Sequence, residues 1–163
     1  MSNIIALDVG DIRVGVAVGT TAPQSFAPLG IYLRAKGRAE QEILRLVMAR
    51  NIEEIVVGLP LSQDGVVNEQ CNKIEKFCLR LQRRCSVKVI FVDEFASSLE
   101  ASEQLAALKK LSLVQKKKKQ DLDAISASII LQSYLENGPQ VVVKILEKPL
   151  EKNYTQTGEG EAS

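Results

Sequence analysis

The chain has 163 residues and a mass of 17.9 kDa, the size of one domain with a single core. An apolar fraction of 45% and a charged fraction of 25% exclude a disordered chain and a membrane-embedded one. The net charge of +1 indicates neither a nucleic-acid nor a membrane partner. No histidine is present, which excludes histidine-based nucleophile pairs and histidine-ligated zinc. Any catalysis must use other groups, and carboxylates suit Mg²⁺ or Mn²⁺ rather than zinc.

The lack of a recognisable signal peptide or membrane span, together with the cysteine usage, favours a cytoplasmic location. The N-terminal sequence lacks the basic segment and apolar stretch of a signal peptide, and no apolar run approaches the roughly 18 residues of a membrane span. The three cysteines, Cys71, Cys78 and Cys85, are an odd number without a Cys-x-x-Cys pair, which is typical of a reducing compartment. We expect them to be buried apolar side chains rather than redox or metal-binding groups.

The hydrophobic pattern alternates between strand and helix periods along the chain. A hairpin is expected first, because two apolar runs flank the turn signal at residues 8–11. The expected strands cover residues 3–7, 14–18, 28–33, 54–59 and 87–92. The expected helices cover residues 39–50, 66–84, 99–111 and 121–135. A hairpin followed by alternating strands and helices predicts an α/β fold with a mixed sheet.

The pattern changes near residue 138. We expect one domain over residues 1–138 and a C-terminal extension over 139–163. Residues 141–146 could add an edge strand, whereas 151–163 are polar and contain glycine, which predicts disorder.

Acidic residues follow two of the expected strands. Asp8 ends the first strand, and Asp93 and Glu94 end the fifth. Carboxylates at strand ends face the crevice where open α/β sheets bind ligands, although Asp8 and Asp11 are equally explained as turn residues. Because successive strand residues point to opposite faces, only one of Asp93 and Glu94 can share the side of Asp8.

The last expected helix adds a further acid beside a basic segment. Asp121 is explained by the preference for aspartate at a helix start, whereas Asp123 lies on the apolar stripe and needs a cationic partner. Acids from two strand ends and one helix suit metal-assisted phosphodiester hydrolysis, which requires no histidine. Just before Asp121 and Asp123, the chain has four consecutive lysines, Lys116, Lys117, Lys118 and Lys119. Such a run is usually a solvated loop, but beside an acidic site it can hold nucleic-acid phosphates.

Four segments together resemble the YqgF/RuvX family of Holliday-junction resolvases and pre-16S rRNA nucleases. They are LDVGDIRVGVAV (7–18), VVGLPLSQDGVVNEQ (56–70), VDEFASSLEA (92–101) and KKQDLDAISASIILQSYL (118–135). Their order and spacing match the family over roughly residues 3–137. Each motif alone is weak, but the four in sequence are specific.

The resemblance implies an RNase H-like fold with a five-stranded mixed β-sheet flanked by helices. It implies a metal-dependent endonuclease whose catalytic and metal-binding residues are Asp8, Glu94 and Asp123, with Mg²⁺ or Mn²⁺ in a two-metal site. Asp11, Asp93 and Asp121 are then no longer candidates. The expected partner is nucleic acid, either pre-rRNA or branched DNA, held by Arg13 and by the lysines at 116–119.

Two positions depart from the family pattern and keep alternatives open. Ile12 and Phe95 stand where the family usually has basic residues, and neither can contact a phosphate as arginine does. One alternative is therefore a non-catalytic nucleic-acid-binding or ribosome-assembly factor on the same fold. Another takes residues 8–15 as the phosphate loop of an actin-like ATPase, although 163 residues supply one lobe only. A homodimer would suit a symmetric junction.

Overall fold

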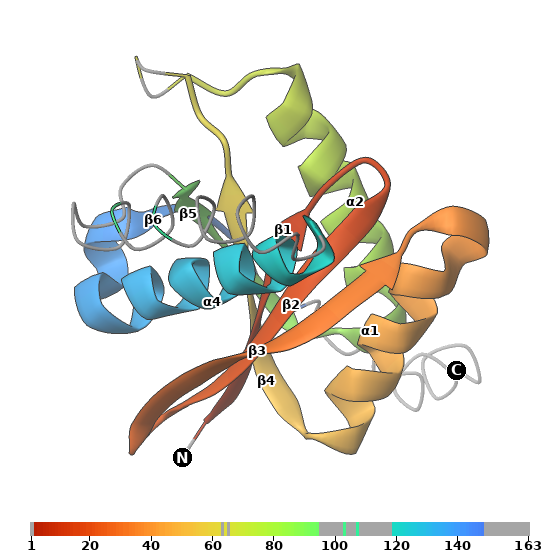
Figure 1. The fold of residues 1–163 in the computed structure, drawn as a ribbon, viewed down its shortest axis with the longest axis horizontal. Coiled ribbons are helices and arrows are strands. Elements are labelled where there is room, and N and C mark those ends of the chain that lie inside the picture. The colour runs from red at the N-terminus through yellow and green to blue at the C-terminus, as the bar shows by residue number, and fades with distance from the viewer. Residues whose placement is uncertain are drawn as a thin grey trace, which may run out of the picture.

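A six-stranded mixed sheet forms the centre of the molecule (Figure 1). The computed structural model describes residues 2–62, 64, 66–94, 103, 107 and 119–148, and at 119–121 the backbone alone. The strands are β1 (Asn3–Val9), β2 (Arg13–Thr21), β3 (Gln24–Leu33), β4 (Ile52–Leu59), β5 (Lys88–Asp93) and β6 (Val142–Leu146). Their order across the sheet is β3-β2-β1-β4-β5-β6. The strands β1, β4 and β5 are parallel, whereas β2, β3 and β6 run antiparallel to their neighbours, so the predicted mixed sheet is confirmed.

The sheet has six strands where five were expected. The additional strand, β6, pairs with β5 from Val89↔Leu146 to Val92↔Val142. It lies within residues 139–163, the segment assigned to the extension, and follows a short 3-10 helix, η3 (Gly138–Val141), whose Val141 is buried in the core. Burial of Val141 and the ladder to β5 explain why this segment joins the sheet. Residues 149–163, including the predicted disordered tail, lie outside the described residues.

In the described part of the chain, three α-helices cover the two faces of the sheet (Figure 1). The helices α1 (Arg38–Ala49) and α2 (Glu69–Cys85) pack on one face, and α4 (Lys119–Asn137) crosses the other. A short 3-10 helix, η1 (Ala35–Gly37), precedes α1. The expected helix at 99–111 lies outside the described residues apart from Glu103 and Ala107, both of them helical.

The second helix begins later than the apolar pattern predicts. Its N-cap is Asn68, whose side-chain oxygen accepts a hydrogen bond from the backbone N–H of Cys71 at 3.0 Å. The apolar residues before the cap, Val66 and Val67, are 57% and 52% exposed and lie outside the helix. The capping preference of asparagine therefore sets the helix start, because these two valines bury little surface.

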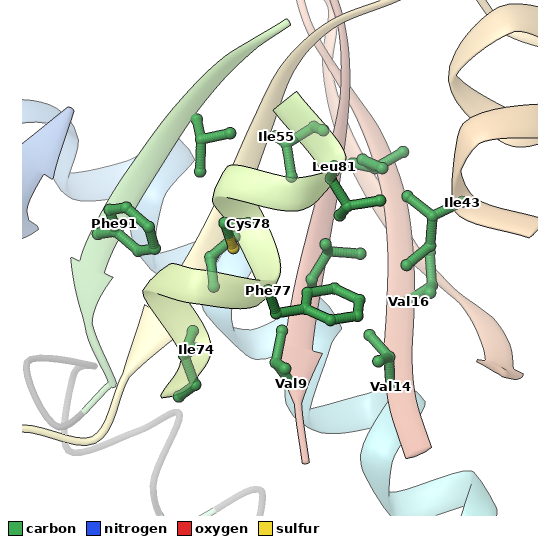
Figure 2. Packing of buried hydrophobic residues seen from close by; sticks show 14 of the residues in the cluster. Val9, Val14, Val16, Ile43, Ile55, Ile74, Phe77, Cys78, Leu81 and Phe91 are labelled. Atoms are coloured by element: carbon green, nitrogen blue, oxygen red, sulfur yellow. The ribbon is translucent and has the colours of Figure 1, made fainter. Parts of the chain in front are cut away.

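Alternating strand residues feed two separate cores. On the side of α1 and α2, Phe77 projects from α2 toward Val9 and Val14 of the sheet (Figure 2). The residues of β1 that face this core have odd numbers, Ile5 and Leu7 among them. On the opposite face, the even-numbered residues of β1, Ile4 and Ala6, pack under α4. This second core also contains Val56 of β4 and Ile90 and Val92 of β5. This alternation decides which strand-end acids can meet.

The cysteines belong to the core on the side of α2. Cys71 and Cys78 are 1% and 0% exposed, and Cys85 is half-buried. Burial raises the pKa of the Cys78 thiol well above its ordinary value, so the thiol stays protonated near neutral pH. The expectation of small apolar core side chains is confirmed for Cys71 and Cys78.

Candidate active site

Asp8 belongs to the face of the sheet that α4 covers. It is the next even-numbered residue of β1 after Ile4 and Ala6, which pack in the core under α4. Its partner across the antiparallel ladder is Gly15 of β2. Asp8 is half-buried and stands one residue before the strand ends. The local pattern thus directs a carboxylate toward the first turns of α4.

The close approach of α4 to the sheet depends on Gly15. A Cβ atom built at this position would lie 2.0 Å from the backbone oxygen of Asp123 and 2.4 Å from its carbonyl carbon. Only glycine leaves room for that backbone, so Gly15 fixes where the beginning of α4 rests on β2. Because Gly15 is paired with Asp8, the same contact brings Asp123 alongside Asp8.

Asp8 and Asp123 line one pocket of about 220 Å³. Its other lining residues are Gly10, Asp11, Ile12 and Arg13, so the turn between β1 and β2 supplies half of the lining residues. Two of the three acids proposed from the sequence, separated by more than a hundred residues in the chain, therefore share one cavity. Asp11 also lines it, although it is an exposed turn residue.

The cationic partner that Asp123 needs is Arg13. The Nε atom of Arg13 donates to Oδ2 of Asp123 at 2.5 Å, and both side chains are about a third exposed or less. Arg13 is the first residue of β2 and lies on the same face as Gly15, two residues away. A charge-assisted hydrogen bond of this length holds the carboxylate in a defined orientation. The residue expected to contact nucleic acid is thus placed against an expected metal ligand.

Glu94 follows β5 on the face that carries Asp8. Val92 packs under α4 and Phe91 on the side of α2, so the alternation directs Glu94 toward α4 and Asp93 away from it. In agreement, a Cβ atom built at Gly58 would lie 3.7 Å from Cβ of Glu94 and 2.6 Å from Cδ1 of Ile130 in α4. The structure therefore separates the two neighbouring acids by face.

The three acids do not form a compact ligand cluster. Glu94 is absent from the described lining of the pocket shared by Asp8 and Asp123. Among the described residues, no group of three or more His, Cys, Asp or Glu side chains is close enough to hold a metal ion. The carboxylate of Asp123 is instead engaged by the guanidinium of Arg13. Asp8 and Asp123 share a cavity, whereas Glu94 shares only the face of the sheet.

Other predicted contacts fall outside the described part of the chain. The structure describes no side chain of Lys116, Lys117, Lys118, Lys119 or Phe95. The alternative of an actin-like ATPase takes residues 8–15 as a loop that binds phosphate. At Gly15 the space beside the backbone is filled by the backbone of α4, so a phosphate has no room there. Gly15 and Gly58 were not predicted as site residues, although an isolated glycine within a strand indicates a close backbone approach.

A second pocket adjoins the first one across the turn between β1 and β2. It has a volume of about 720 Å³ and shares Asp11 and Ile12 with the acidic pocket. Its cationic side chains, Arg34, Lys73, Lys76 and Arg80, were not predicted. Arg34 follows β3, and the other three lie on α2 with uncharged or acidic residues between them, so no run of consecutive charges marks the pocket in the sequence. Among the described helices, none is long and apolar enough to span a membrane.

Comparison with known proteins places the chain in a family. The model of the RuvX family, described as Holliday junction resolvase, matches residues 2–137. A "Putative pre-16S rRNA nuclease" of Chloroflexus aurantiacus is 40% identical over 134 residues, covering 82% of this chain and 86% of the relative. A protein of the same name from Fusobacterium nucleatum is 34% identical over 137 residues, covering 83% of this chain and 98% of the relative.

Solved structures show the same fold at low sequence identity. Thermus thermophilus RuvC superimposes with a TM-score of 0.54 at 13% identity, covering 86% of this chain and 99% of that one. The RuvC chain solved in complex with a Holliday junction substrate gives a TM-score of 0.52 at 12% identity, covering 88% of this chain and 100% of that one. The expected RNase H-like fold is therefore confirmed. With a family model matched over residues 2–137 and relatives up to 40% identical, the chain belongs to the RuvX family.

Proposed function

We propose that this protein is a metal-dependent endonuclease that hydrolyses phosphodiester bonds while processing the 5′ end of pre-16S rRNA. The observation that carries the proposal is the shared pocket of Asp8 and Asp123, on the sheet face to which Glu94 also belongs. Family membership and the names of the relatives support it. Branched DNA is the second substrate class, because the family model is described as Holliday junction resolvase.

The donor atoms are of the type that a hard divalent cation prefers, although the three carboxylates do not converge on one point. Asp8 and Asp123 offer carboxylate oxygens to one cavity, and Glu94 offers a third carboxylate from the same face. Bound there in a two-metal arrangement, Mg²⁺ or Mn²⁺ would activate water and stabilise the leaving oxygen. Asp8, Glu94 and Asp123 are the residues that would hold the cations. The free cysteines and the proposed substrate are consistent with a cytoplasmic location.

Arg13 gives the site a basic group beside its acids. Within the described part of the chain, only its Nε donor is bound to a side chain, that of Asp123. The terminal nitrogens of the guanidinium can therefore donate to a phosphate oxygen while Asp123 stays oriented. The lysines at 116–119 are proposed to contact other phosphates of the same nucleic-acid strand.

A second candidate function is nucleic-acid binding without catalysis. The observation that favours it is Ile12, which is 69% exposed and lines both pockets. An exposed apolar residue at this position cannot neutralise a phosphate, so the turn lacks the basic group that the family usually has there. Turnover could be lost while the fold and backbone binding are kept.

Cleavage assays with matched substrates test the proposal. A 5′-extended 16S precursor RNA and a four-way DNA junction are each incubated with the wild-type protein in Mg²⁺, in Mn²⁺ and in EDTA. We expect cleavage of the RNA in either metal and none in EDTA, and a loss of at least about a hundredfold in Asp8→Asn, because an amide is a poor ligand for a hard cation. Thermal unfolding shows whether the variant is folded. Equal cleavage by the wild-type protein and a folded Asp8→Asn variant would contradict the proposal.

A further inference from the structure

The larger pocket is strongly basic. Arg34, Lys73, Lys76 and Arg80 line it, and Asp11 is the one acid among its described lining residues. Its wall combines the segment after β3 with one side of α2 and reaches the turn between β1 and β2. Because Asp11 and Ile12 also line the acidic pocket, the two cavities lie on either side of that turn.

Helical spacing puts three of the cations on one stripe of α2. Lys73, Lys76 and Arg80 are three and four residues apart, which places them on the same side of the helix. Like charges at this spacing repel one another and contribute nothing to helix stability. Arg80 is partly compensated by Glu40, with Nε and Oε1 3.5 Å apart. Lys73 and Lys76 are exposed and form no ion pair among the described residues, so their charge is available to a ligand.

The fourth cation is held in place by the fold. Arg34 donates from Nη1 to the backbone oxygen of Gly10 at 2.8 Å, and its guanidinium carbon lies 4.9 Å from the centroid of the Phe77 ring. Both contacts immobilise the side chain beside the turn. The remaining N–H groups of the guanidinium make no hydrogen bond within the described part of the chain, which leaves a fixed donor set at the pocket.

We propose that this basic pocket binds the phosphodiester backbone of the substrate strand, beyond the turn from the scissile phosphate. The inference rests on the proposed function, because the nucleic-acid strand that is cleaved in the acidic pocket would pass over Ile12 into the basic pocket. A backbone ligand fits because the described lining has four cations and no aromatic side chain on which a base could stack. The pocket would hold substrate without reading its sequence, and would offset the repulsion between the phosphates and the three acids.

A charge-removal pair on α2 tests this pocket. The double variant Lys73→Ala/Lys76→Ala is compared with Arg83→Ala/Arg84→Ala, which removes two charges from exposed positions of the same helix outside the pocket. Binding of a 5′-extended 16S precursor RNA and of a four-way DNA junction is measured in EDTA at several salt concentrations. We expect the lysine pair to weaken binding about tenfold or more and to reduce the salt slope by about 1.4 to 1.8, at roughly 0.7 to 0.9 for each phosphate contact.

The control pair is expected to retain wild-type affinity within about twofold and the wild-type salt slope. A loss confined to one probe supports the pocket and identifies that nucleic acid as its ligand. Wild-type affinity and salt slope in a folded Lys73→Ala/Lys76→Ala variant, beside a wild-type protein that cleaves RNA, would overturn the pocket and leave the nuclease function intact. A wild-type protein that binds neither probe in EDTA and cleaves neither in Mg²⁺ or Mn²⁺ overturns both.

Discussion

Replacement of Glu94 by glutamine is expected to lower phosphodiester cleavage at least about a hundredfold. The strand alternation directs Glu94 toward α4, on the face shared by Asp8, and its Cβ lies next to Gly58 on that face. Loss of an outer-shell partner already costs about 10 to 100-fold in metal sites, and a direct ligand should cost no less. Single-turnover cleavage of the precursor RNA in saturating Mg²⁺ measures the effect on the chemical step.

Asp93 provides the matched control one residue earlier. It ends β5 and follows Val92, so it faces the side of α2 and lies on the face opposite Asp8. The variant Asp93→Asn changes the same kind of group at the same strand end, and we expect its cleavage rate to stay within about threefold of the wild type. Similar losses in the two variants, with thermal unfolding unchanged in both, would show that the face of the sheet does not select the functional acid.

Alanine in place of Gly15 is expected to destabilise the protein and to disrupt the site together. The added Cβ would meet the Asp123 backbone at 2.0 Å, and a backbone neighbour cannot rotate away. Overpacking of this kind costs about 1–3 kcal/mol, occasionally more, and each kcal/mol lowers Tm by about 2–4 °C at this chain length. Because α4 must move off β2, Asp123 is displaced from Asp8, and cleavage should fall about tenfold or more.

Gly30 is the corresponding control in the neighbouring strand. It pairs with Val16 from β3, and a Cβ built there meets nothing within 4 Å. The variant Gly30→Ala should therefore keep wild-type cleavage, and its Tm should be unchanged or raised slightly, because alanine reduces the entropy of the unfolded chain. Calorimetry and the cleavage assay together compare the two variants. A Gly15→Ala protein as stable and as active as Gly30→Ala would refute the close approach of α4.

The sequence predicted those elements well whose apolar residues form either one stripe of a helix or an unbroken run in a strand. The apolar runs at residues 3–7, 54–59 and 87–92 predicted strands, and the structure has the parallel strands β1, β4 and β5 there, covered on both faces. The third strand is longer than expected, Gln24–Leu33 against 28–33, because pairing with β2 continues through residues 24–27, which are exposed and show no alternation of apolar and polar side chains. The edge strand β6 was weakly marked for the same reason, since most of its residues are exposed.

The candidate site was predictable in its residue types and only partly in its geometry. Alternation along a strand predicts that only one of Asp93 and Glu94 shares the side of Asp8, and the family resemblance is what selects Glu94. The apolar stripe of the last helix singles out Asp123 by a local rule. The ion pair between Arg13 and Asp123 spans 110 positions, and no local pattern encodes it. The basic pocket was missed because its lysines and Arg80 read as the solvated face of α2, and Arg34 joins them only when the segment after β3 lies against that helix.

The central claim is that Asp8, Glu94 and Asp123 belong to one site that binds a divalent cation. A titration with Mn²⁺ tests it most directly, with the unbound ion measured by electron paramagnetic resonance. The full chain is titrated beside Asp8→Asn and the control Asp93→Asn. We expect saturable Mn²⁺ binding by the wild-type protein and by Asp93→Asn, and a loss of at least about tenfold in affinity in Asp8→Asn. Identical Mn²⁺ binding by all three proteins, or no saturable binding by the wild-type protein, would contradict the account.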